Sequence, residues 1–433
     1  MLNHFLNLCK IKLPPKFQSL SLVYIGMFSQ SRKTNPLFSL ALISICLIGA
    51  MSSWFSGTVI LQEITLRSQL GESQQVWLTN SVQLGFVVGA LLIAFFNIAD
   101  TAPLPILIAF SCAVASSTNL LLIWIETPYG IIALRFLTGA ALSGVYPPVV
   151  KLIATWFEKG RGFAMGIIIG ALTIGCSMPQ LFRALTLDTN WLFVIWASSL
   201  ATFIAGAIFL FFISEGPFVF ARARFDPRQI MLVIRNKPLT LINIGYVGHM
   251  WELYAMWAWI LVFAQFSAQN FTRFPFGTPE YFCFFVVAIG AIGCIAAGRL
   301  SDIYGRCWTT AGLMIISGTC AFLIGFLLNG PPIWFVIIAL LWGMTVIADS
   351  GQFSAAVTEL SDQHLVGTAL TVQMALGFGV TVITIWLVPI FAQWLGSFQW
   401  AFLFLAPGPV IGAIAMLLLR KRPEDYKLAL GKR

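Results

Sequence analysis

The stretch GRLSDIYGR, Gly298–Arg306, is a short polar run with two glycines and three charged residues between two long apolar segments. Backbone polar groups cannot stay unpaired in lipid, so we expect this run to leave the bilayer as a hairpin between two membrane helices. Its glycines, Gly298 and Gly305, allow a turn that larger residues cannot make. Asp302 and Arg306 are spaced to pair with each other or with a neighbouring helix end, and either pair would form a latch that can open.

The composition is that of an integral membrane protein. The chain has 433 residues, of which 59% are hydrophobic and only 9% are charged, whereas about a quarter of the residues of a soluble domain are charged. A spanning helix needs roughly 20 apolar residues, so the chain has room for about a dozen spans and for no separate soluble domain. The formal charge of +9 resides in loops and tails beside apolar runs. Membrane orientation and anionic lipid explain such charge better than nucleic acid does.

The sequence offers no pattern for a metal site, a cofactor or an enzyme. The three histidines, His4, His249 and His364, are dispersed, and the cysteines inside apolar segments lack the paired spacing of metal ligands. We find neither G-x-S-x-G nor H-E-x-x-H, and no G-x-x-x-x-G-K-S/T stretch for ATP. We therefore expect no cofactor, no bound metal and no enzymatic activity, and energy that comes from an ion gradient or from the solute's own gradient.

Twelve apolar runs are long enough to be membrane spans, and the longest charged break divides them six and six. We predict an all-α protein with twelve transmembrane helices. The runs lie near 37–60, 76–97, 103–124, 128–156, 162–183, 191–213, 239–266, 280–298, 309–328, 332–357, 366–393 and 398–419.

Lysine and arginine collect in the even-numbered loops and in both tails, which predicts that both termini are cytoplasmic. The basic loop residues are Lys159, Arg161, Arg222, Arg224, Arg228, Arg235, Lys237, Arg299 and Arg306. The predicted parts are a cytoplasmic N-terminal segment (1–36), a first helical bundle (37–213), a cytoplasmic linker (214–238), a second bundle (239–419) and a cytoplasmic tail (420–433).

The hairpin resembles the loop signature of the major facilitator superfamily, roughly G-x-L-A/S-D-x-x-G-R-K/R. The matching residues are Gly298, Leu300, Ser301, Asp302, Gly305 and Arg306, and Cys307 departs from the pattern. The resemblance implies two pseudo-symmetric six-helix bundles that move a solute by alternating access. An eroded copy follows the second span, where Asp100 keeps the acidic position while Pro103 replaces the second glycine.

A second resemblance lies in span four. Arg135 to Gly139, followed by Gly144, Tyr146 and Pro147, is similar to the family's R-x-x-x-G membrane motif. The glycine-proline motif that the family's antiporters carry in span five is not clearly present, which lowers the odds of drug efflux without excluding it.

Four ionisable residues stand out inside the spans, namely Arg135, His249, Glu252 and Asp349, whereas Lys151 lies near the cytoplasmic end of its span and can snorkel. A charge at the bilayer centre costs about 3 kcal/mol or more, so each is a functional candidate. The resemblance implies that spans one, four, seven and ten line a central cavity, and therefore places all four near the solute.

Helical spacing adds Trp259 to the face of His249 and Glu252, and Gln352 to the face of Asp349. Simpler roles stay open for each of these residues. Glu252 and Arg135 can form a static ion pair that docks the two halves, and Asp349 can belong to a gate. His249 can be a hydrogen-bonded neighbour, and the ring of Trp259 can serve only for packing.

We expect a secondary active transporter for a small organic solute. One arginine and two acids suit an organic acid, a zwitterion or a larger metal chelate, and proton-coupled symport with Glu252 as the proton carrier is favoured. The alternatives are an efflux antiporter or a siderophore transporter of the same fold, and a membrane receptor or scaffold without transport. The expected partners are the solute, a proton or another coupling ion, and the lipid of a bacterial inner membrane. We expect a monomer.

Overall fold

The computed structural model describes residues 35–157, 161–186, 190–218, 226–362 and 365–431. The chain separates into two units, Met1–Ser39 and Leu40–Arg433, and every site discussed below lies in the second. Most of the predicted N-terminal segment lies outside the described residues, as do Lys159, Arg222, Arg224 and His364.

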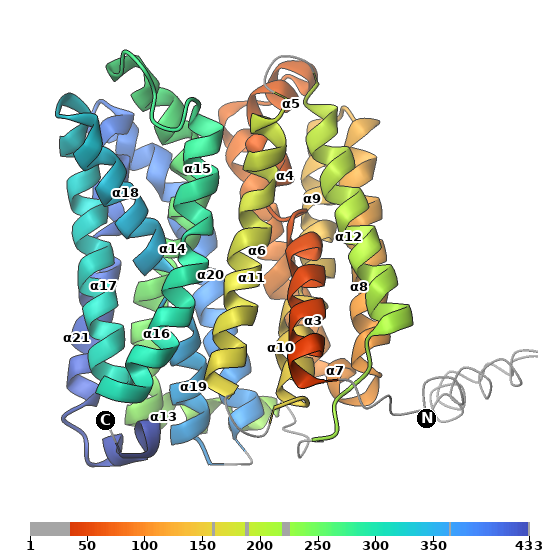
Figure 1. Ribbon diagram of the computed structural model, residues 1–433, viewed down its shortest axis with the longest axis vertical. Helices are drawn as coiled ribbons and strands as arrows, with labels where there is room; N and C mark the ends of the chain where they lie inside the picture. Colours follow the sequence, from red (N-terminus) through yellow and green to blue (C-terminus); the bar gives the residue numbers. More distant parts are fainter. Residues whose placement is uncertain (1–34, 158–160, 187–189, 219–225, 363–364, 432–433) are drawn as a thin grey trace, which may run out of the picture. The chain divides into compact units, whose positions relative to one another are not determined.

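All regular structure in the described part of the chain is helical (Figure 1). Before the linker, the helices are α3 (Pro36–Met51), α4 (Ser56–Val59), α5 (Leu61–Ser68), α6 (Glu72–Phe95), α7 (Ile98–Thr101), α8 (Leu104–Leu120), α9 (Pro128–Leu142), α10 (Tyr146–Ala154), α11 (Arg161–Ala184) and α12 (Leu192–Phe212).

Within the predicted linker lies α13 (Ile230–Arg235), and the remaining helices are α14 (Lys237–Ser267), α15 (Pro279–Ala288), α16 (Gly290–Tyr304), α17 (Arg306–Leu323), α18 (Pro332–Val346), α19 (Ser350–Leu360), α20 (Val366–Trp394) and α21 (Pro407–Leu419). Short 3₁₀ segments extend several of these helices, and the last of them is η6 (Pro423–Gly431).

Ten helical stretches of the described chain are long and apolar enough to cross a membrane. They are Glu72–Phe95, Leu104–Ile123, Pro128–Ala154, Gly162–Ala184, Leu192–Phe212, Pro279–Tyr304, Arg306–Asn329, Pro332–Leu360, Val366–Trp394 and Phe398–Leu419. These ten match all the predicted runs except the first and the seventh. The first falls on α3, a shorter apolar helix, and the seventh falls on α14, which has 31 residues and holds His249 and Glu252.

Several predicted spans are broken into two helices, among them span one between α3 and α4 and span eight at Ile289 between α15 and α16. Span four is interrupted between α9 and α10, where Gly144 lies, and span ten is interrupted between α18 and α19 at Ile347–Asp349. Because of this break, Asp349 lies at the N-terminal end of α19, immediately before its first residue. An apolar run gives the length of a span but not its continuity, so sequence did not predict these breaks.

The GRLSDIYGR stretch is less of a loop than predicted. Helix α16 continues through Tyr304, and α17 starts at Arg306, so the turn consists of Gly305 alone. Gly305 has φ +85°, a conformation that favours glycine. A Cβ on Gly298 would lie 3.6 Å from Gly162 O, an ordinary contact distance, so only Gly305 is required to be glycine by this turn. A helix satisfies its own backbone hydrogen bonds, so the chain can stay helical until it turns.

Glycine contacts repeat between the two halves of the sequence. A Cβ on Gly139 of α9 would lie 2.0 Å from Val82 O of α6, and one on Gly343 of α18 would lie 1.7 Å from Val286 O of α15. Gly343 and Val286 follow their counterparts by the same number of residues. Glycine therefore lets equivalent helix pairs approach closely in both halves, as expected for an internal repeat.

The halves meet through α11, which packs against α15 and α16, and through α6, which packs against α20 (Figure 1). Asn80 of α6 also donates from Nδ2 to Val382 O of α20 at 3.2 Å. Residues after α12 are fixed to one end of the helices, which we call the linker end. There Glu215 Oε1 accepts from Leu104 N at 2.9 Å, and Gly216 N donates to Thr155 Oγ1 at 2.7 Å.

Candidate functional site

Arg135 is completely buried in the first half of the chain and is held by uncharged groups. Its Nη1 donates to Ser53 O at 3.1 Å, Ser56 Oγ at 3.2 Å and Asn119 Oδ1 at 3.1 Å. Its Nη2 donates to Trp54 O. Among the described residues no carboxylate pairs with this guanidinium. Arg135 therefore keeps an uncompensated positive charge in the protein interior.

Glu252 is buried inside the second half of the chain, also among neutral partners. Ser317 Oγ of α17 donates to its Oε2 at 2.8 Å, and Trp342 Nε1 of α18 donates to its Oε1 at 2.6 Å. The static Arg135–Glu252 ion pair that sequence left open is absent from the described residues. Each residue is therefore tied to its own half.

His249 and Asp349 form a buried pair, one turn of α14 from Glu252 toward the linker end. His249 Nδ1 lies 2.8 Å from Asp349 Oδ1, and both side chains are almost fully buried. The rings of Tyr246 and Phe353 flank the imidazole, with centroids 5.9 and 5.6 Å away. His249 Nε2 has no hydrogen-bond partner among the described residues. The break between α18 and α19 positions Asp349 for this pair.

An aromatic layer contributed by both halves lies beside Arg135. We use this name for Trp54, Phe55, Phe86, Tyr254, Trp257 and Phe378. Ring centroids are 5.5 Å apart for Trp54 and Tyr254, and 4.4 Å apart for Phe86 and Phe378. Within the described structure Trp257 Nε1 lacks a hydrogen-bond partner, as do both amide atoms of buried Gln83, one turn of α6 from Phe86. Polar groups without partners thus lie on or near the layer.

The latch residue Arg306 binds helix α19. Its Nε donates to Glu359 Oε2 at 2.7 Å, its Nη2 donates to Glu359 Oε1, and its Nη1 donates to Gln352 Oε1 at 2.7 Å. Of the two partners that sequence allowed, a neighbouring helix end is the one observed. Gln352, which was expected to line the solute path, contacts the latch. Asp302 lies beside Gly162 at the start of α11, with Oδ2 3.8 Å from where a Cβ on that glycine would be.

The C-terminal tail shares the carboxylate of Glu359. Ala429 N donates to Glu359 Oε2 at 3.1 Å, and the neighbouring Leu428 is fully buried. The eroded copy of the motif also forms an ion pair, because Asp100 Oδ1 lies 2.6 Å from Lys151 Nζ of α10. In each half, a charged residue that follows the second span therefore binds the end of the fourth: Asp100 binds span four, and Arg306 binds span ten.

Comparison with known proteins agrees with this architecture. The model of the family described as Major Facilitator Superfamily matches residues 40–383 and 285–433, which together cover nearly the whole chain. The chain belongs to the Major Facilitator Superfamily. The resemblance predicted from Gly298–Arg306 is confirmed, and with ten apolar helices the chain is a multi-pass integral membrane protein of a transporter family. No match to an individual curated protein accompanies the family match.

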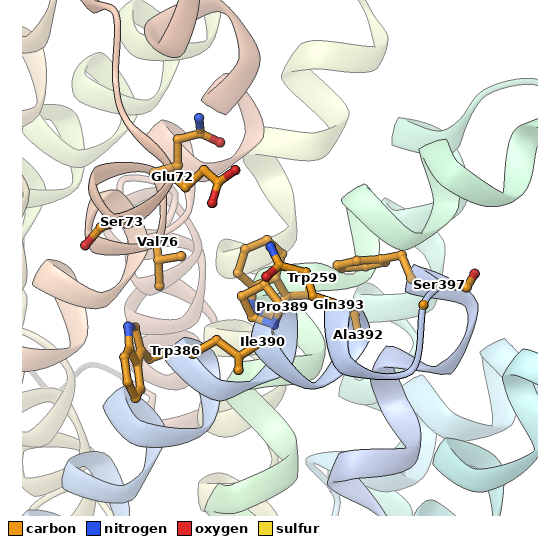
Figure 2. A pocket seen from close by; sticks show the side chains of 13 residues that line it. Glu72, Ser73, Val76, Trp259, Trp386, Pro389, Ile390, Ala392, Gln393 and Ser397 are labelled. Atoms are coloured by element: carbon orange, nitrogen blue, oxygen red, sulfur yellow. The ribbon is translucent and has the colours of Figure 1, made fainter.

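In this Major Facilitator Superfamily protein, Trp259 lies apart from the buried charges. Its ring lines a pocket between α6 and α20 (Figure 2). The predicted residues therefore fall into a buried group (Arg135, His249, Glu252, Asp349), a linker-end group (Asp100, Gly298, Asp302, Gly305, Arg306, Gln352) and Trp259 at the pocket.

Sequence reasoning missed the partners of these residues. Ser53, Ser56, Asn119, Ser317 and Trp342 are uncharged residues inside apolar runs, where nothing separates a hydrogen-bonding side chain from a packing one. Glu359 carried a usable signal, because an acid at the end of span ten is well placed to meet a basic loop.

Proposed function

We propose that this protein is a secondary active transporter that moves a small anionic or zwitterionic organic solute by alternating access with proton symport. The observation that carries the proposal is the isolation of two buried ionisable groups. Arg135 and Glu252 lie in different halves of the chain, and each is bound only by uncharged groups in the described structure. Buried charges without a charged partner are costly, so they are expected to serve function.

The uncompensated guanidinium supports an acid group on the solute. In a low-dielectric interior its field reaches further than in water. Trp257 Nε1 and the amide of Gln83 are unpartnered donors and acceptors that a solute can satisfy, and the aromatic layer offers ring faces to its apolar part.

The surroundings of Glu252 support its role as proton carrier. The hydroxyl of Ser317 can donate to a carboxylate and can accept from a carboxylic acid, so both charge states can be hydrogen-bonded. His249 and Asp349 lie one turn further toward the linker end and provide the next proton-accepting groups. We propose that the proton passes from Glu252 to this pair.

The proposed architecture has twelve spans in two six-helix bundles (37–213 and 239–419), joined by the 214–238 linker. The linker end faces the cytoplasm of a bacterium, with both termini on that side of the inner membrane, and the protein acts as a monomer without enzymatic activity. An efflux antiporter or a siderophore transporter is the alternative within the same fold. A receptor or scaffold without transport is the alternative of another class, and net solute uptake separates it from the proposal.

The test begins with thermal stabilisation of the purified protein by a panel of carboxylic acids, amino acids and metal chelates, because a ligand of the folded state raises its stability. The stabilising solute is then followed into proteoliposomes. Glu252→Gln mimics the protonated acid, so it should lose accumulation driven by a pH gradient and keep solute exchange. Glu126→Gln, which removes an exposed acid far from the buried group, is the control and should keep accumulation. Accumulation by the Gln variant at the wild-type level would refute coupling through Glu252.

A further inference from the structure

A pocket of about 750 Å³ lies at the end of the helices opposite the linker end, between the start of α6 and the last turns of α20 (Figure 2). Glu72, Ser73, Gln75 and Val76 form the α6 side. The opposite side comes from α14, α20 and the chain just after it, through Trp259, Trp386, Pro389, Ile390, Ala392, Gln393, Gly396, Ser397 and Phe398. Pockets of this size hold drug-sized molecules. None of the residues that carry the proposed transport function lines it, although Trp259, a candidate from sequence, does.

A hydrogen bond within the protein holds the main aromatic residue of the pocket in place before any ligand binds. Trp259 is buried, and its Nε1 donates to Ile385 O at 2.9 Å. That carbonyl lies four residues before Pro389, which stands inside α20 and has no N–H to offer it. The indole nitrogen is therefore occupied while the ring lines the cavity. Trp386 and Phe398 add further aromatic surface.

The charged part of the polar lining is negative. Glu72 is the one charged residue among the described residues that line the pocket, and its side chain is exposed. Gln75 donates its amide to Leu70 O, which leaves its own oxygen to face a ligand. The N-terminus of α6 carries about half a positive charge on this side, which is less than the full negative charge of Glu72, so the lining stays negative. A carboxylate beside indole faces attracts cations.

We propose that this pocket binds an organic ammonium compound with an apolar or aromatic body, whose cationic group lies between Glu72 and the indole rings of Trp259 and Trp386. An anionic ligand is disfavoured by Glu72 and by the absence of any lysine, arginine or histidine from the described lining. The site thus differs in charge from the Arg135 region and goes beyond the proposed transport function. An occupant touches α6 and α20, one helix from each half of the chain, and so links the halves.

Binding is measured with benzyltrimethylammonium as probe, by the concentration dependence of thermal stabilisation of the purified full chain in detergent. Benzyl alcohol and phenylacetate are the neutral and anionic controls. The cation should bind at least about threefold more tightly than either control, as a cation–π contact with a nearby carboxylate requires. Equal stabilisation by phenylacetate would overturn the proposal.

Variants locate the site. Glu72→Gln and Trp386→Leu change exposed side chains, so the fold should tolerate both, and each should weaken binding of the cation at least about threefold. Glu126→Gln removes an exposed acid outside the pocket and should leave the affinity unchanged. If Glu72→Gln binds the probe like the wild type, the assignment is wrong, and if Glu126→Gln weakens binding as much as Glu72→Gln does, the probe is sensing surface charge and the assignment is wrong as well.

Free amines and the choline headgroup of a lipid share this chemistry. Adding phosphatidylcholine to the micelles separates the two sources, because a headgroup that enters the pocket competes with benzyltrimethylammonium and weakens its apparent affinity. An unchanged affinity assigns the site to free solutes. None of these measurements involves transport, so their failure and that of the Glu252 test are distinguishable.

Discussion

The indole N–H of Trp259 donates to the backbone carbonyl of Ile385 at 2.9 Å. In an uninterrupted helix the N–H of the residue at position 389 would bind that carbonyl, but Pro389 has none. The side chain of α14 therefore replaces the backbone bond missing from α20. The carbonyl that Pro389 leaves without a backbone donor is thus the acceptor of the buried indole N–H of Trp259.

This relationship predicts that Trp259 and Pro389 are coupled energetically. Trp259→Phe should lower the free energy of unfolding by about 1–3 kcal/mol, because it leaves a buried carbonyl without a donor. In the Pro389→Ala background the loss should be smaller, since the alanine N–H can bind Ile385 O. Thermal unfolding of the four proteins in detergent gives the coupling. Trp251→Phe, which removes an indole N–H from Phe404 O, is the control, and Pro389→Ala should not rescue it.

The positions of most spans could be read from apolar length, and the family could be read from Gly298–Arg306. The interruptions of spans four and ten were missed, although each carries a signal in the sequence: Pro147 and Pro148 follow the first, and Asp349, Ser350 and Gly351 lie at the second. Helix α16 also runs through most of the motif, since polar residues do not end a helix that has passed the lipid. The glycine contacts depend on the partner helix, which sequence does not show.

The repeated glycine contacts predict matched damage in both halves. Gly139→Ala and Gly343→Ala each place a Cβ within 2.0 Å of a backbone carbonyl oxygen, so the helix pairs must separate. We expect a loss of about 1–3 kcal/mol or more for each. Gly312→Ala and Gly379→Ala are the controls, because a Cβ there meets nothing within 4 Å. Thermal unfolding that ranks the controls below Gly139→Ala and Gly343→Ala in stability would contradict the close packing.

The buried charges were predictable because arginine, histidine and acids are rare in apolar runs. Their partners were not. Glu252 could meet Arg135 as far as sequence shows, yet a serine and a tryptophan of its own half bind it. Gln352 shares a helix face with Asp349, yet its Oε1 accepts from Arg306 Nη1 at 2.7 Å. Helical spacing gives the face of a residue and leaves open which neighbour occupies it.

The shared carboxylate of Glu359 predicts that the tail and the latch open together. Glu359→Ala removes the acceptor of Ala429 N and the partner of Arg306. A hydrogen bond to a charged group contributes about 1.5–3 kcal/mol, so amide exchange in Pro423–Gly431 should speed up by about tenfold or more. Hydrogen exchange with mass spectrometry measures it. Asp362→Asn, an exposed acid just after α19, is the control, and equal exchange in both variants would refute the link.

The isolated charge of Arg135 predicts a strong effect of placing an acid beside it. Asn119 accepts from Ser56 Oγ at 2.6 Å and from Arg135 Nη1 at 3.1 Å, and donates to Ser199 Oγ at 2.9 Å. Asn119→Asp keeps both acceptor roles, and the hydroxyl of Ser199 can reverse its bond, so the fold should survive. The new carboxylate neutralises the guanidinium that we propose attracts the solute.

Asn119→Asp should therefore weaken binding of an anionic solute by about tenfold or more, which corresponds to ~1.4 kcal/mol. The solute is the one that the stabilisation panel identifies, and its affinity is measured by the same thermal shift. Asn119→Ala removes the contacts without adding charge, so it should lower stability and weaken solute binding less than the Asp variant does. If Asn119→Asp binds the anion as tightly as the wild type, the field of Arg135 does not reach the solute, and the guanidinium serves only to join α9 to the chain around Ser53 and Trp54.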